Sequence, residues 1–242
     1  MPHQGKPKAP IAALLAIGKD RERKGYFVLC VLLAALLVLA LAIPETPWSQ
    51  TLIDLIFVFT LISAGYSVAD SRGMSICVLG LGLLLVVLAV PSALATSPVW
   101  DLPARVAAAV FLVTVTVALL VDVVTGGHGR GVSPGLIAGA TAVYLMIGLT
   151  YSSFYAVAYL IDPEAFRGAI LSDTGSRPHD MLYFSFVTLS TLGYGDITPT
   201  NGLSQMLSIT EALAGQLYLT ILVARLVGMH IAEGPPHKSD GP

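Results

Sequence analysis

A six-residue loop near the C-terminus, Thr191–Asp196 with the sequence TLGYGD, carries the residue types and spacing that could do chemistry. Gly193 and Gly195 can adopt backbone angles that are closed to other residues. With glycine at alternate positions, successive backbone carbonyls can turn to one side of the chain, and Thr191 adds a hydroxyl at one end. Such a row of oxygens can replace the water shell of a dehydrated cation. A Gly-Tyr-Gly triplet by itself is weak evidence, because it also occurs in ordinary turns.

The segment before the loop predicts how the loop is positioned. Residues Met181–Ser190 are moderately apolar and cover about three helical turns, which is too short to cross a bilayer. Pro178 suits a first helical turn, and Asp180 is favourable near a helix N-terminus. Non-helical backbone is tolerated at membrane depth only where it is buried in protein or lines water. The pattern therefore predicts a re-entrant half-helix followed by an extended loop, with the negative end of the helix favouring a cation.

The composition is that of a membrane protein. Of 242 residues, 55% are hydrophobic and only 12% are charged, and the mean hydropathy is +0.79, whereas soluble domains carry about 25% charged residues. The net charge of −2 suggests no nucleic-acid partner. Cys30 and Cys77 lie in apolar stretches and are interpreted as packing residues. No phosphate-binding glycine loop, zinc-spaced Cys/His set or nucleophile–base arrangement stands out, so we expect neither an enzyme nor a cofactor.

The expected fold class is an all-α membrane protein, with six stretches long enough to span about 30 Å of hydrocarbon. These stretches are Tyr26–Ile43, Thr51–Val68, Met74–Val90, Ala104–Val124, Leu136–Ile161 and Leu203–His230. Their connecting segments alternate between basic and non-basic, which predicts cytoplasmic termini. The basic N-terminus followed by an apolar stretch could also be a signal peptide. No convincing small-residue cleavage site follows it, so a retained helix is preferred.

A Thr-x-Gly-Tyr-Gly-Asp loop between membrane helices resembles the selectivity filter of potassium channels. The resemblance implies that K⁺ is bound by the carbonyls of residues Thr191–Tyr194, with Gly195 completing the filter. One chain supplies one wall, so the resemblance also implies a homotetramer in the cell membrane, with lipids as further partners and permeant K⁺ in place of a cofactor. Leu192 and Ser190 stand where valine and threonine are commoner, both conservative in shape.

By the same resemblance, Asp196, Tyr183 and Phe184 form a cuff behind the filter. Many relatives have a Trp-Trp pair there, which can donate hydrogen bonds; Phe184 cannot, although Tyr183 retains one donor. Val187 stands where some bacterial relatives carry a buried glutamate. The pattern indicates a filter with fewer polar tethers.

The sixth span resembles the inner helix that carries the gate. Gly215 has the spacing of a hinge glycine, although close packing against the pore helix is an equal alternative. The resemblance assigns Gln216, Thr220 and Val223 to a water-filled cavity and Val227 to a lower constriction. Arg225 is expected to snorkel to the cytoplasmic interface. Glu211, a carboxylate within a span, is a functional candidate by default; a structural tether to the back of the pore helix is favoured.

Six spans with a loop before the last resemble voltage-gated cation channels, but the fourth span lacks their arginine repeat. Arg105 is its only basic residue, at the outer end, and sensors carry about 3–4 charges per subunit. Asp54 lies at a similar depth, so the two could pair across helices, or both could simply reach the headgroups. The short tail leaves no room for a ligand-binding domain, so gating is expected to come from the membrane, the filter or a partner.

The expected organisation assigns 1–25 to a basic cytoplasmic N-terminus and 26–124 to a sensor-like four-helix domain. It assigns 125–135 to a linker, 136–232 to the pore domain and 233–242 to a tail. The function expected from the resemblance is passive, potassium-selective permeation. A non-selective cation channel and a non-conducting regulatory subunit of a transport system remain alternatives, and Tyr194 argues against the first of them.

Overall fold

The computed structural model describes residues 9–42, 60, 80, 82–83, 101–126, 133–168 and 178–232. These residues are mostly helical, and four of their helices are long and apolar enough to cross a membrane. The four helices are α1 (Ala9–Ala42), α4 (Asp101–Gly126), α5 (Pro134–Ile161) and α7 (Gly202–Ala232). They correspond to the first, fourth, fifth and sixth predicted spans. Of the second and third predicted spans, only residues 60, 80, 82 and 83 are among the described residues, so these two spans stay predictions.

The helix α1 begins well before the first predicted span. Its apolar window is Gly25–Ala42, close to the predicted Tyr26–Ile43, but the helix itself starts at Ala9. The added turns are rich in alanine, leucine, lysine and arginine, which are good helix formers, and Pro10 lies in the first turn, where a missing N–H is tolerated. Much of the basic N-terminal segment is therefore helical.

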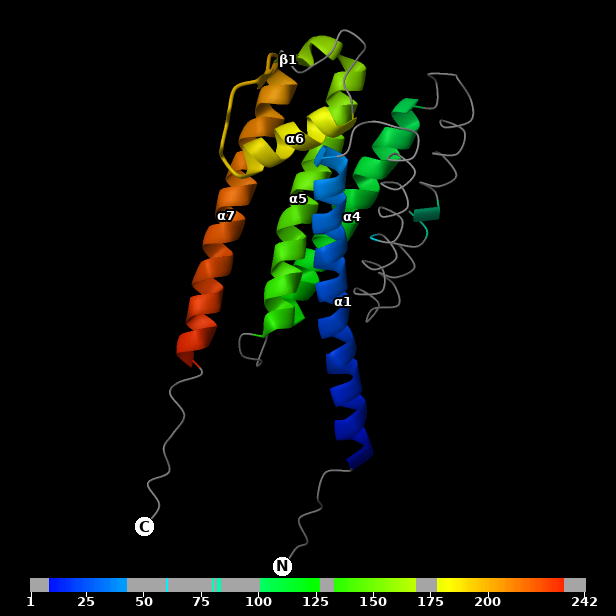
Figure 1. Ribbon diagram of the computed structural model, residues 1–242, viewed down its shortest axis with the longest axis vertical. Coiled ribbons are helices and arrows are strands. Elements are labelled where there is room, and N and C mark those ends of the chain that lie inside the picture. Colours follow the sequence, from blue (N-terminus) through cyan, green and yellow to red (C-terminus); the bar gives the residue numbers. More distant parts are fainter. Residues whose placement is uncertain are drawn as a thin grey trace, which may run out of the picture.

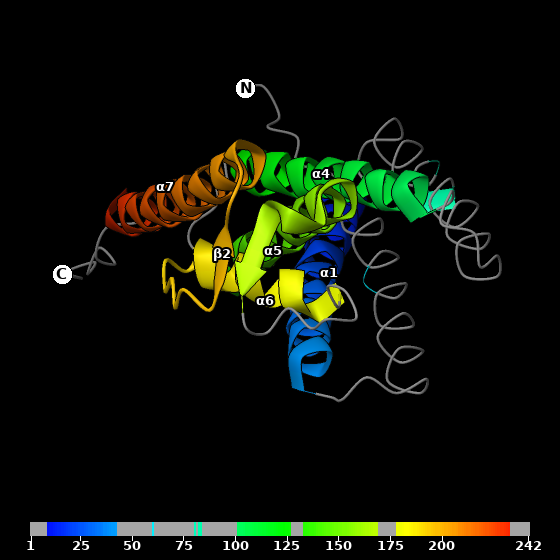
Figure 2. The same ribbon diagram turned by 90° about the horizontal axis from the view of Figure 1, so that it is seen from above.

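The membrane-length helices run alternately up and down. α1 and α5 rise in the view of Figure 1, whereas α4 and α7 descend, so that α1 begins at the end of the molecule where α7 finishes. The short helix α6 (Pro178–Leu189) lies across the upper end. Seen from above, α5 and α6 lie between α1 and α7 (Figure 2). α5 is the central helix, because it packs against α1, α4, α6 and α7.

Two apolar clusters form the core around α5. The larger joins α1, α4 and α5 and includes Leu29, Leu33, Phe111, Leu119 and Met146. The smaller lies beneath α6, where the rings of Tyr155, Phe166 and Phe184 meet edge-on with centroids 4.9–5.5 Å apart. Edge-to-face rings are a favourable aromatic geometry, so this cluster fixes α6 on the upper part of α5.

Capping residues set the ends of α5. The Ser133 hydroxyl accepts a hydrogen bond from the Leu136 N–H at 3.2 Å, and Pro134 occupies the first helical position. At the other end Asp162 is extended and precedes Pro163, which disfavours a helical residue before it. A 3₁₀ turn, η2 (Pro163–Ala165), follows, and the Asn201 amide donates to Asp162 Oδ2 at 2.8 Å. That bond joins the end of α5 to the start of α7.

A two-stranded antiparallel ladder adds a β element to the expected all-α architecture. Strand β1 (Phe166–Gly168) pairs with β2 (Ile197–Pro199), with Arg167 opposite Thr198. A Cβ built on Gly168 would lie 2.2 Å from the Asp196 carbonyl oxygen, so only glycine permits this approach. Strands of three residues carry too short an alternation to be recognised in the sequence. The ladder ties the segment after the TLGYGD loop to the end of α5.

Two polar contacts connect the lower ends of the helices. The Tyr26 hydroxyl of α1 donates to the Asp122 carboxylate of α4. The guanidinium of Arg225 donates to the carbonyls of Val123 and Val124 at 2.9 Å each. α4 ends at Gly126, so these carbonyls belong to its last turn, where the helix is negative and lacks internal partners. Arg225, expected to snorkel toward the headgroups, instead caps α4.

We predict that Arg225→Leu lowers the stability of the protein by about 2 kcal/mol, because two carbonyls lose a charged donor. Arg225→Lys should recover only part of this, since an ammonium lacks the planar fork of a guanidinium. Thermal unfolding in detergent, followed by circular dichroism, measures the effect. Arg105→Leu makes the same change at an exposed position of α4. Equal shifts for Arg105→Leu and Arg225→Leu would contradict the capping role.

Candidate functional site

The end of α6 leads directly into the TLGYGD loop. The Thr191 N–H donates to the Thr188 carbonyl and the Leu192 N–H to the Val187 carbonyl, both at 2.9 Å. These two bonds, with Thr191 at φ 58°, form a Schellman motif that caps the helix. Glycine usually occupies the left-handed position of this motif, whereas here it is threonine. The left-handed region is a genuine outlier for a β-branched residue, and such strain is typical of functional sites.

The backbone alternates in handedness along the loop. Thr191, Gly193 and Gly195 have φ of 58°, 57° and 78°, whereas Leu192 and Tyr194 between them do not have positive φ. Alternating left- and right-handed residues reverse every second peptide plane relative to a strand, so their carbonyls can lie along one side. This is the arrangement that oxygen coordination of a bare cation requires.

The loop lies open at the surface of the single chain. Tyr194 is 66% exposed and Leu192 is 58% exposed. A Cβ built on Gly193 or Gly195 would meet nothing within 4 Å. These glycines are therefore required by their backbone angles rather than by crowding within the chain. Within the described part of the chain, the loop is therefore one open wall that encloses no site.

Asp196, the last residue of the loop, is bound from behind by α6. Tyr183 Oη donates to Asp196 Oδ2 at 2.5 Å, and the Ile197 N–H donates to Oδ1 at 3.0 Å. The hydrogen bond to Asp196 raises the pKa of Tyr183 to about 12, so the phenol remains a donor at neutral pH. Phe184 does not share this position, because it lies in the aromatic cluster with Tyr155 and Phe166. The two residues expected in one cuff thus point to different partners.

Glu211 joins three helices behind the loop. Its side chain is fully buried and binds the hydroxyls of Tyr155 from α5 and Ser185 from α6, each at 2.5 Å. The Ser185 hydroxyl also lies 2.7 Å from the Gly148 carbonyl oxygen of α5. Glu211 therefore contacts α6, which is the contact that the tether interpretation requires. Tyr155 and Ser185 were not foreseen, because partners 56 and 26 residues away leave no local pattern.

Gly215 provides a close approach between α7 and the end of α6. A Cβ there would lie 2.6 Å from the Leu189 carbonyl oxygen and 2.8 Å from its side chain. The same carbonyl accepts a hydrogen bond from Tyr144 Oη at 3.3 Å. α7 continues as a helix through this position. The contact is that of the close-packing interpretation, and a hinge at Gly215 stays a prediction.

α7 presents one narrow stripe to its own chain. The stripe residues are buried or half-buried and recur at spacings of four and three: Ser204, Ser208, Glu211, Gly215, Tyr218, Leu222 and Arg225. The residues assigned to the cavity and constriction lie off the stripe and are exposed in the single chain: Gln216, Thr220, Val223 and Val227. In the most apolar 18-residue segment of α7, only 6% of the residues are buried. Most of its surface is left for lipid, water or other chains.

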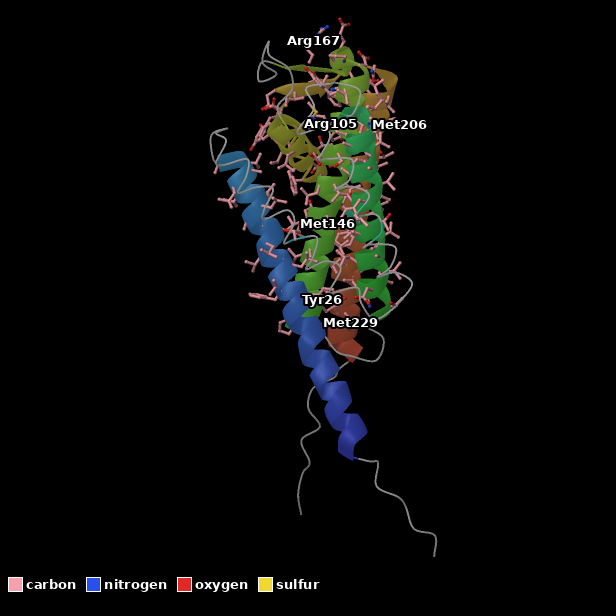
Figure 3. All side chains as sticks on the ribbon, turned by 90° about the vertical axis from the view of Figure 1, so that its right-hand side faces the viewer. Tyr26, Arg105, Met146, Arg167, Met206 and Met229 are labelled. Atoms are coloured by element: carbon pink, nitrogen blue, oxygen red, sulfur yellow. The ribbon has the colours of Figure 1, made fainter. Side chains whose placement is uncertain are left out.

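Of the predicted pair Asp54 and Arg105, the structure describes only Arg105. Arg105 is exposed and lies toward the end of the molecule that carries Arg167, away from Tyr26 and Met229 (Figure 3). Asp54 lies outside the described residues. The pairing therefore stays a prediction.

Comparisons with known proteins match the part of the chain that contains the site. Residues 140–231 match a family model described as "Ion channel". Over 86 residues the chain is 40% identical to Two pore potassium channel c of Oryza sativa subsp. japonica, and over 83 residues 44% identical to Two-pore potassium channel 4 of Arabidopsis thaliana. It is 32% identical over 87 residues to Protein LctB of Bacillus caldotenax.

The coverage of these matches is partial. Each match takes in about a third of this chain, 34–35%. It spans 16% and 28% of the two plant proteins and 64% of LctB. No solved structure matches the chain.

We predict that Gly215→Ala destabilises the packing of α7 against α6 by about 1–3 kcal/mol, because the added methyl group overlaps the Leu189 carbonyl. Gly228→Ala, in the same helix, is the matched control. A Cβ at Gly228 would meet nothing within 4 Å, and alanine is a better helix former than glycine. The comparison is made by thermal unfolding in detergent. A Gly215→Ala protein as stable as the Gly228→Ala protein would show that the contact is not constraining.

We predict that Tyr183→Phe weakens the hold on Asp196, because it removes the donor and leaves the ring. Hydrogen bonds to charged groups contribute about 1.5–3 kcal/mol. Hydrogen–deuterium exchange of the 191–197 backbone should be faster in the variant. Tyr159→Phe, on α5, is a control that keeps the Asp196 bond. Unchanged exchange in Tyr183→Phe would argue against this support.

Proposed function

We propose that the protein is the subunit of a potassium-selective channel, because residues 140–231 match an ion channel family model and the chain is similar to two plant two-pore potassium channels. It would let K⁺ pass the cell membrane passively, down its electrochemical gradient. The observation that carries the proposal is the alternation of backbone handedness at Thr191, Gly193 and Gly195. No enclosed pocket or catalytic step is required of such a protein, only a fixed row of oxygens.

The row of oxygens is supplied by the carbonyls of Thr191, Leu192, Gly193 and Tyr194. They replace the hydration shell of the ion as it enters. The C-terminal end of α6 adds the negative end of a helix close to this row. Tyr194 supports potassium selectivity, because related non-selective channels often carry a different residue at this aromatic position.

The exposed surfaces support a closed ring of four copies. One chain provides one wall, and its loop and much of the surface of α7 are uncovered in isolation. In a tetramer the four loops meet at the axis. Gln216, Thr220 and Val223 then line a water-filled cavity, and Val227 forms a hydrophobic constriction below it. Gly195 and Asp196 stand at the outer mouth.

We place both termini in the cytoplasm and include the two predicted spans between α1 and α4. The opposite directions of α1 and α4 fit an even number of spans between them. Arg105 is the only basic residue of α4 and is exposed near one end. It would cross little of the membrane field, so we expect weak voltage dependence.

The test is ion flux from proteoliposomes loaded with potassium chloride or sodium chloride, with a proton-coupled dye and a protonophore. We expect flux with potassium, little with sodium, and loss of potassium flux in Gly193→Ala. Alanine at a left-handed position costs about 1–2 kcal/mol per chain. Gly202→Ala is the matched control, since its Cβ would also meet nothing and its φ is not left-handed.

Other outcomes separate the alternatives. Equal flux of both ions would overturn selectivity and leave a non-selective channel. Absence of flux from a protein that sizes as a tetramer would favour a non-conducting regulatory subunit. A monomeric mass in mild detergent would overturn the channel proposal, because one wall cannot enclose an ion path.

A further inference from the structure

The Ser185 hydroxyl lies within hydrogen-bonding distance of two oxygen atoms. Its Oγ is 2.7 Å from the Gly148 carbonyl oxygen and 2.5 Å from Glu211 Oε1. Both distances are those of hydrogen bonds, and Ser185 is fully buried. A serine hydroxyl carries one proton. The carbonyl has none to offer, so the second bond requires a proton on the carboxyl group.

The other carboxyl oxygen has a donor of its own. Tyr155 Oη donates to Glu211 Oε2 at 2.5 Å, and the Tyr155 side chain is fully buried. Oε2 therefore accepts, while Oε1 faces a hydroxyl whose proton is committed to Gly148. A carboxylic acid, which accepts at one oxygen and donates from the other, satisfies all three contacts. An ionised carboxylate accepts only and would leave one short oxygen–oxygen contact without a proton.

The surroundings favour the same species. Both side chains that bind Glu211 are neutral hydroxyls. Glu211 itself has no exposed surface and lies within a membrane-length helix. Among the described residues no cationic side chain binds it, and a carboxylate buried there without a cationic partner is strongly unfavourable.

We propose that Glu211 is held as a neutral carboxylic acid whose proton, on Oε1, is donated to Ser185. Ser185 is then free to donate to Gly148, and one chain of hydrogen bonds fixes α6 to α5 and α7. Glu211 is a positioning residue for the helix that carries the loop, a role that rests on the proposed channel function. It adds no charge to the ion path.

The test compares the wild-type protein with Glu211→Gln by difference infrared spectroscopy in detergent at neutral pH. The expected difference spectrum contains the C=O stretching band of a protonated carboxylic acid, which shifts in D₂O. A difference spectrum with carboxylate bands alone would overturn the proposal.

Thermal unfolding gives a second readout. Glutamine accepts through its carbonyl and donates through its amide, so Glu211→Gln should keep the unfolding midpoint within about 2 °C. Glu211→Leu, which keeps the bulk and loses the hydrogen bonds, should lower it by about 4–8 °C. Equal loss in both variants would argue for an ionised carboxylate.

Neither readout requires ion flux. A protein that shows the acid band and conducts nothing keeps the proton assignment and overturns only the channel. A protein that conducts potassium and shows carboxylate bands alone supports the channel and overturns the proton assignment.

Discussion

The structure depends on fixing the backbone of the TLGYGD loop, which makes few hydrogen bonds of its own. Among the described residues, the bonds that the loop makes to its own helix end with the amide of Gly193, beyond which Tyr194 and Gly195 have no such bond. Carbonyls at membrane depth need partners from protein, water or ions. In the proposed channel the permeating ion and the other copies provide them. The conformation must therefore be imposed from behind, by elements that never touch the ion.

Those elements act at different points of the loop. The Schellman cap sets its start, where Thr191 is kept left-handed against its own preference. Tyr183 and the β1–β2 ladder set its end, through Asp196 and Ile197. Glu211, on α7, fixes α6, the helix before the loop, to α5 and α7. The aromatic cluster beneath α6 adds apolar packing without a polar partner. Each support acts on a separate part of the α6–loop segment.

The sequence predicts the parts that local chemistry determines. Apolar length places the four spans that the structure describes, Pro178 and Asp180 mark the start of α6, and the glycine spacing marks the loop. Contacts between distant segments leave no such trace: Ser185 is a small polar residue on a short helix, and nothing near it points to Glu211. In the sequence, Arg225 has the pattern of a snorkelling residue. The carbonyls that it binds belong to a helix about 100 residues earlier, so no local pattern indicates them. The ladder escapes because its strands are three residues long.

The narrow stripe on α7 also separates two kinds of position. Substitutions on the stripe act when the single chain folds, and substitutions off the stripe act when copies assemble. Changes at Glu211, Gly215 or Tyr218 affect the folding of the single chain, since these residues pack on α5 and α6. Ile209 and Leu213 are exposed in the single chain, so we expect changes there to leave its folding intact. In a tetramer their effect arises only when copies meet. In the proposed tetramer, one helix would thus carry two classes of loss-of-function substitution, one that acts on the folding of a chain and one that acts on the assembly of copies.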